Sequence, residues 1–164
     1  LDRYLFTAGL ITIEPEVYDG EALPYKQKGD RIVTKNQIAS LAKGNYAEAI
    51  VLRTLPNPDE KKSTVYSGTN PPYLEPEALD LLREKGVKHL LLDLPSVDRE
   101  VDGGKLAAHH RFWQGGREDD KQCTITEMVF IPNEISDGYY LLDLQTAPFE
   151  NDATPSRPVL YALN

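Results

Sequence analysis

Two adjacent histidines and one glutamate are the side chains best suited to metal or proton chemistry. His109 and His110 follow the acidic stretch "PSVDREVDGG", and Glu127 stands inside the apolar run "TITEMVFIP". Imidazole and carboxylate groups bind Zn²⁺ or Mn²⁺, and both transfer protons. A carboxylate in an apolar strand is costly to bury unless it is paired or binds a cation. Glu127 is therefore either such a group or a solvated residue on an edge strand.

The two histidines cannot act together from one regular helix. The stretch from Lys105 to Gln114 contains helix-forming residues and predicts a short helix. Consecutive residues of a helix point about 100° apart, so at most one of His109 and His110 faces a given metal ion. By spacing alone, an ordinary pair is favoured, with one ring partly buried and the other exposed.

Two loops offer further polar groups. Asp93 ends the apolar run from Leu90 to Leu92, and ligand sites of open α/β sheets lie beyond the carboxyl ends of such strands. The following charged residues, Asp98 and Arg99 among them, are expected by spacing alone to form a solvated surface loop. The stretch "YSGTNPPY" (66–73) supplies Tyr66 and Asn70 as candidate substrate contacts, or simply connects two elements.

An α/β layer must position these groups. Thr34 and Gln37 fit a capping box, and Gly44 fits the residue that ends a helix. Acids and a proline precede a second helix, and Gly86 follows it. The last third predicts consecutive β-strands rather than βα units. Strands are expected at 4–14, 47–54, 87–94, "TITEMVFIP", "GYYLLDLQTA" and "RPVLYAL", and helices at 34–44, 74–86 and 105–114.

The composition argues against several classes of partner and several kinds of site. The 164 residues suit one domain, and the net charge of −8 argues against nucleic acid and anionic membranes as partners. Cys123 is the only cysteine, which excludes an internal disulfide and a thiolate zinc cluster. No apolar run of about 18 residues is present that would predict a membrane span. We expect a cytoplasmic protein that acts on a small molecule.

The order of four motifs resembles the order found in a known protein family. "HLLLDLPSVD" is followed by "AAHH", then by a glutamate in "TITE", and near the end by "SRPV". This order is similar to the cyclase family of metal-dependent hydrolases, which includes bacterial kynurenine formamidase. The resemblance implies an α/β fold of the swivelling β/β/α type with a mixed sheet, a divalent metal (Zn or Mn) and a homo-oligomer. It assigns His109, rather than His110, and Glu127 as metal ligands and catalytic groups.

One family motif is missing. The first metal-binding block of the family, His-x-Gly-Thr-His-x-Asp-x-Pro, does not occur in this sequence. We therefore expect residues 1–164 to form a single domain without the N-terminal metal-binding segment, and the natural protein to be longer at its N-terminus.

Two functions follow from the resemblance. The first is a metal-dependent hydrolase of the kynurenine formamidase type, in which activated water attacks an amide, ester or lactone carbonyl. The alternative is an inactive scaffold or binding protein that retains the fold. With His109 and Glu127 as its recognised ligands, the 164-residue chain is expected to bind metal weakly.

Overall fold

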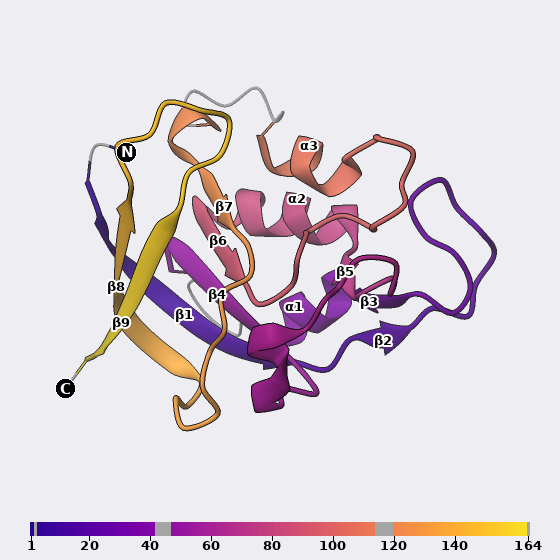
Figure 1. Cartoon of the computed structure of the whole chain (residues 1–164), viewed down its shortest axis with the longest axis horizontal. Coiled ribbons are helices and arrows are strands. Elements are labelled where there is room, and N and C mark those ends of the chain that lie inside the picture. Colours follow the sequence, from indigo (N-terminus) through magenta and orange to yellow (C-terminus); the bar gives the residue numbers. More distant parts are fainter. Residues whose placement is uncertain (2, 42–46, 114–119, 164) are drawn as a thin grey trace.

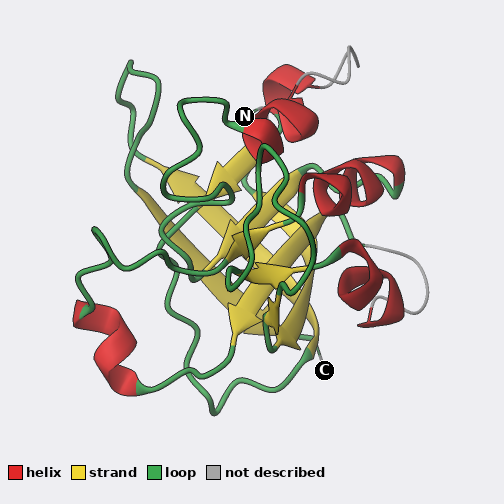
Figure 2. Cartoon of the chain, turned by 90° about the vertical axis from the view of Figure 1, so that its right-hand side faces the viewer, coloured by secondary structure: helices red, strands yellow, loops and turns green. Residues whose placement is uncertain are grey.

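A mixed β-sheet flanked by helices forms the centre of the fold. The structure is a computed structural model of the whole chain, and it describes residues 1, 3–41, 47–113 and 120–163. Figure 2 shows the strands crossing the middle of the molecule, with the helices at its periphery. The expected α/β fold with a mixed sheet is confirmed.

The main sheet places several strand ends at one edge. Within the described residues its strand order is β7-β6-β4-β1-β8-β9. The parallel strands are β1 (Leu5–Ile13), β4 (Ala49–Thr54), β6 (His89–Leu92) and β7 (Thr124–Thr126). The antiparallel strands are β8 (Gly138–Thr146), paired with β1, and β9 (Ser156–Ala162), paired with β8. The carboxyl ends of the parallel strands therefore meet at the same edge.

A smaller sheet and short helices complete the described chain. The small sheet has the order β2-β3-β5, formed by β2 (Glu16–Val17), β3 (Arg31–Val33) and β5 (Tyr73–Leu74). The α-helices are α1 (Lys35–Leu41), α2 (Pro76–Glu84) and α3 (Ala107–Trp113), and the 3₁₀-helices are η1 (Asp59–Ser63) and η2 (Asp120–Gln122). No described helix reaches the length and hydrophobicity that crossing a bilayer requires.

Alternating side chains of the main sheet pack into two cores. Successive residues of a strand point to opposite faces. Leu52 of β4 and Leu92 of β6 therefore face the helices, where Phe112 of α3 is fully buried with them. Val51 and Leu91 face the other side and belong to a second cluster. Figure 1 shows α2 and α3 over the half of the sheet that contains β6 and β7, away from β9.

The helix signals act locally as expected. The backbone N–H of Thr34 donates to Gln37 Oε1 (3.0 Å), and the N–H of Gln37 donates to Thr34 Oγ1 (3.2 Å), which confirms the capping box at α1. The predicted end of this helix at Gly44 lies outside the described residues. Helix α2 begins at Pro76, and Gly86 follows it with φ of 87°. That left-handed conformation favours glycine after a helix.

The last third departs from the expectation in one respect. Strands β8 and β9 form the expected antiparallel pair, but β7 pairs parallel with β6 after crossing through α3. It therefore completes a βαβ unit. Strand β7 also ends at Thr126, so Glu127 follows the strand rather than lying inside it. Met128 has φ of 62°, and this left-handed conformation interrupts the regular extension of the chain.

Candidate active site

The candidate site lies where β6 and β7 end. Asp93 follows β6, Glu127 follows β7, and α3 connects the two strands. Because β6 and β7 are parallel neighbours, the segments that leave them begin at the same edge of the sheet. Helix α3 packs against α2 and carries His109 toward this edge. The topology thus brings together residues that are 18 positions apart in the sequence.

His109 lies between two carboxylates. Its Nδ1 is 2.6 Å from Asp98 Oδ2, and its Nε2 is 3.6 Å from Glu127 Oε1. The Glu127 oxygen also accepts a hydrogen bond from the backbone N–H of Val97 (3.0 Å). The structure therefore brings His109 and Glu127 together, as two ligands of one metal ion would have to be, whereas the neighbouring His110 is exposed. Their chemical roles stay predictions.

The expectation for Asp98 and Arg99 as a solvated loop is wrong. The Asp98 side chain is 6% exposed and also accepts backbone N–H groups of Ala108 (2.6 Å) and His109 (3.2 Å). Arg99 donates from Nε to Asp30 Oδ2 (2.9 Å) and is largely buried. The loop folds inward because the start of α3 and the buried Asp30 supply partners that the local sequence does not reveal.

The contacts of the three groups shift their pKa values. Burial alone would raise the pKa of Asp98, but hydrogen bonds from the His109 ring and from the backbone of Ala108 and His109 lower it. Burial alone would lower the pKa of His109, but the hydrogen bond to Asp98 and the charge of Glu127 raise it. Burial raises the pKa of Glu127 despite the opposing effects of Val97 N–H and His109. Such an arrangement suits proton transfer.

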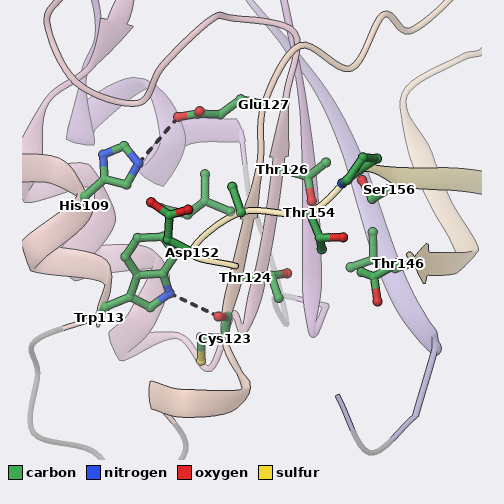
Figure 3. A pocket seen from close by; sticks show the side chains of 14 residues that line it. His109, Trp113, Cys123, Thr124, Thr126, Glu127, Thr146, Asp152, Thr154 and Ser156 are labelled. Atoms are coloured by element: carbon green, nitrogen blue, oxygen red, sulfur yellow. Dashed lines mark hydrogen bonds and ion pairs between the residues drawn. The ribbon is translucent and has the colours of Figure 1, made fainter. Parts of the chain in front are cut away.

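A cavity of about 580 Å³ opens beside His109 and Glu127. This volume lies in the range of small-molecule sites. Figure 3 shows Trp113 and Asp152 near His109, with hydroxyl side chains along the remaining wall. The Trp113 ring lies 5.3 Å from the His109 ring, and its Nε1 donates to the carbonyl of Cys123 (3.0 Å). The hydroxyls belong to Thr124, Thr126, Thr146, Thr154 and Ser156.

The two candidate substrate contacts lie elsewhere. Tyr66 lines a separate cavity of about 120 Å³ together with Asp93, and burial and the Asp93 charge raise the pKa of its hydroxyl. Asn70 donates from Nδ2 to Asp30 Oδ1 (2.8 Å). Neither is among the described residues that line the cavity beside His109. Their substrate-binding role stays a prediction.

A buried ion pair that the sequence did not predict lies at the same edge. Lys61 Nζ lies 2.7 Å from Asp93 Oδ2, and it also donates to the hydroxyl of Thr54 (2.8 Å). The Asp93 side chain is 1% exposed. The position of Asp93 after a buried strand was a usable signal, but nothing local indicated that Lys61 would turn inward from its loop.

The geometry fits part of a metal site. Two ligands that each lie about 2.1 Å from a tetrahedral zinc are separated by about 3.4 Å, close to the 3.6 Å between His109 Nε2 and Glu127 Oε1. A carboxylate on the other ring nitrogen, here Asp98, is the usual partner of a metal-binding histidine. However, no group of three or more His, Cys, Asp or Glu side chains suited to a metal occurs among the described residues. The site is thus incomplete within them.

Curated proteins with similar sequences support the family that the order of the motifs indicates. The kynurenine formamidase of Bacillus cytotoxicus is 35% identical over 92 residues, which are 56% of this chain and 41% of that protein. The enzyme of Bacillus mycoides is 33% identical over 89 residues, 54% of this chain and 39% of that protein. The matched segment therefore spans about two fifths of these curated relatives.

Solved structures share the fold. A structure described as a potential metal-dependent hydrolase with cyclase activity superposes with a TM-score of 0.66 and 16% identity, covering 98% of this chain and 66% of the other. An isatin hydrolase bound to the product analogue thioisatinate gives 0.64 and 16%, covering 96% and 60%. The family model described as "Putative cyclase" matches residues 1–99, more than half of the sequence. The chain therefore belongs to the Cyclase family.

Proposed function

We propose that the chain forms part of a metal-dependent hydrolase that acts on an amide, ester or lactone carbonyl. The observation that carries the proposal is the placement of His109 between Asp98 and Glu127 at the wall of a ligand-sized cavity. The relatives named as kynurenine formamidases make an N-formyl amide the first substrate to test. The fold neighbours, named as metal-dependent hydrolases and an isatin hydrolase, extend the candidates to cyclic amides.

His109 and Glu127 would hold the metal ion from one side. A bound divalent ion, Zn²⁺ or Mn²⁺, polarises a carbonyl and lowers the pKa of bound water toward neutrality. Glu127, whose pKa burial raises, would orient the attacking water or accept its proton. If His109 does not serve as a ligand, its Nε2 is placed to give or take a proton at the cavity wall.

The alternative is a scaffold that binds a ligand without catalysis. It is favoured by one observation: in the described part of the chain, the candidate site joins only two suitable ligands, whereas a catalytic zinc usually has three. We also propose, from the family resemblance, a small-molecule substrate and a homo-oligomeric assembly.

Metal binding and turnover separate these possibilities. Titration calorimetry with Zn²⁺ and Mn²⁺, and release of kynurenine from N-formylkynurenine with and without a chelator, would be compared for the wild type, His109→Ala and Glu127→Gln. His110→Ala is the matched control, because it removes an exposed imidazole at the next position.

The hydrolase proposal expects the first two variants to lose at least about tenfold in metal affinity, and the control to match the wild type. Equal affinity in all four proteins would overturn the assignment of the site. Metal binding by the wild type without hydrolysis of any amide, ester or lactone would support the scaffold.

A further inference from the structure

The Asp98 carboxylate makes contacts that exceed those needed to cap a helix. Its Oδ1 accepts the backbone N–H of Ala108 at 2.6 Å. Its Oδ2 faces the ring Nδ1 of His109 at 2.6 Å and the backbone N–H of His109 at 3.2 Å. One buried carboxylate thus holds both the first turn of α3 and the imidazole that this turn carries.

The chemistry of these contacts determines where the imidazole carries its proton. An ionised carboxylate only accepts hydrogen bonds, and a neutral imidazole has one N–H and one lone pair. Asp98 Oδ2 lies 2.6 Å from Nδ1, within hydrogen-bond distance, whereas Glu127 Oε1 lies 3.6 Å from Nε2, so the proton of the neutral ring belongs on Nδ1. The lone pair then belongs on Nε2, the nitrogen that points toward Glu127 in Figure 3.

We propose that Asp98 is a positioning residue that fixes His109 in the tautomer with its proton on Nδ1 and a free lone pair on Nε2 facing the cavity. The tautomer can be observed in the protein without metal or substrate. Its consequence, that Nε2 is ready to bind a metal ion or accept a proton, rests on the proposed function. The tautomer and its role in metal binding or proton transfer can therefore be refuted separately.

The substitution Asp98→Ala provides the sharpest perturbation because it removes the acceptor that faces Nδ1 of His109. Asp98→Asn is less suitable, since an amide oxygen in the Oδ2 position would still accept both the Nδ1–H and the backbone N–H of His109. Without the carboxylate, neither ring nitrogen has a fixed partner at hydrogen-bond distance. Asp98→Ala should therefore leave the tautomer unfixed.

The test is ¹⁵N NMR of the histidine rings in alkaline buffer without metal, where the imidazoles are neutral. The sequence contains three histidines, and the signal lost in His109→Ala assigns the ring of interest. We expect the Nδ1–H pattern for His109 in the wild type and a mixture of the Nδ1–H and Nε2–H patterns in Asp98→Ala. His89 and His110 should keep their wild-type patterns.

A matched control distinguishes positioning from general loop stability. Asp102 lies in the same loop and accepts the backbone N–H groups of Gly104 (2.7 Å) and Leu106 (2.6 Å). Asp102→Ala should leave the His109 pattern unchanged. The positioning role is overturned if Asp98→Ala retains the pure Nδ1–H pattern in a folded protein, or if the wild type shows Nε2–H.

Zinc titration provides the second readout. Asp98→Ala should lower the affinity for Zn²⁺ by about 10- to 100-fold, the usual effect of losing the carboxylate behind a metal-binding histidine, and Asp102→Ala should not change it. A mixture of tautomers in Asp98→Ala with unchanged Zn²⁺ affinity would retain the positioning role and overturn its link to the metal. Absence of hydrolysis would bear only on the proposed function.

Discussion

The buried Asp30 should make stability strongly dependent on pH, and replacing it with asparagine tests this. The Asp30 side chain is 2% exposed and receives hydrogen bonds from Arg99 Nε (2.9 Å), Asn70 Nδ2 (2.8 Å) and the Tyr73 hydroxyl (2.7 Å). These contacts join the end of the 18–30 connection to β5 and to the loop that carries Asp98. Arg99 is the residue directly after Asp98, so the same cluster supports the candidate site.

The magnitude follows from the pKa of Asp30. Burial alone would raise this pKa, but the hydrogen bonds from Arg99, Asn70 and Tyr73 lower it from an ordinary 3.8 to about 2. Because one pKa unit corresponds to about 1.4 kcal/mol, the ionised carboxylate contributes roughly 2 kcal/mol to the free energy of unfolding. A lowered pKa gives a contribution that is complete well above the unfolded-state pKa near 4 and is lost as the pH falls toward 2.

Urea unfolding at several pH values measures this contribution. At neutral pH, Asp30→Asn should lower the free energy of unfolding by about 3 kcal/mol, because it removes a charge that pairs with the buried Arg99. The difference from the wild type should shrink by roughly 2 kcal/mol between pH values of about 5 and 2. Asp19→Asn is the control, since Asp19 pairs with Lys28 on the surface and should change stability by less than about 0.5 kcal/mol.

Two results would contradict this role of Asp30. One is an Asp30→Asn protein as stable as the wild type at neutral pH. The other is a large difference that stays constant as the solution is acidified, which would show that the carboxylate acts by packing rather than by its charge.

Three further predictions concern the framework of the site and its assembly. Lys61→Met should cost about 3–5 kcal/mol in urea unfolding because it removes the cation that pairs with the buried Asp93 carboxylate. Lys62→Met, at an exposed position, should be neutral, and equal effects of the two substitutions would contradict the ion-pair argument. Phe112→Ala should lower the free energy of unfolding by about 3–5 kcal/mol, because it leaves a cavity where the fully buried Phe112 ring packs α3 against the core. A decrease below about 1 kcal/mol would show that α3 packs loosely. Sedimentation velocity should show a homo-oligomer. Tyr161 is exposed on the edge strand β9, and Tyr161→Lys should weaken the association. A monomer at all protein concentrations would exclude the homo-oligomer.

Local patterns predicted the elements of the fold where the signal lies within a few residues. The capping box of Thr34 and Gln37 and the glycine after α2 depend on neighbours in the sequence, and the structure retains both. The strand expected at 87–94 is also present as β6, and all four of its residues are buried. The parallel pairing of β7 was not predicted, because it depends on the crossover through α3 rather than on neighbouring residues.

The candidate site was predictable only in part. The motif order assigned His109 and Glu127, and the structure places them 3.6 Å apart. The burial of Asp98 could not be inferred from a charged loop, because its partners come from the helix start ten residues later. Lys61 and Asp93, which form a buried ion pair, are likewise 32 positions apart in the sequence. Long-range partners decide which charged residues are buried, and a single sequence does not show them.

The anomalous scattering of crystals grown with Zn²⁺ would show whether His109 and Glu127 bind a metal ion together. We predict a zinc peak in the cavity beside α3, about 2.0–2.2 Å from both His109 Nε2 and a Glu127 oxygen, with the Asp98 carboxylate still at Nδ1. Zinc bound only at exposed groups such as His110 or surface carboxylates, with His109 and Glu127 free of metal, would contradict it.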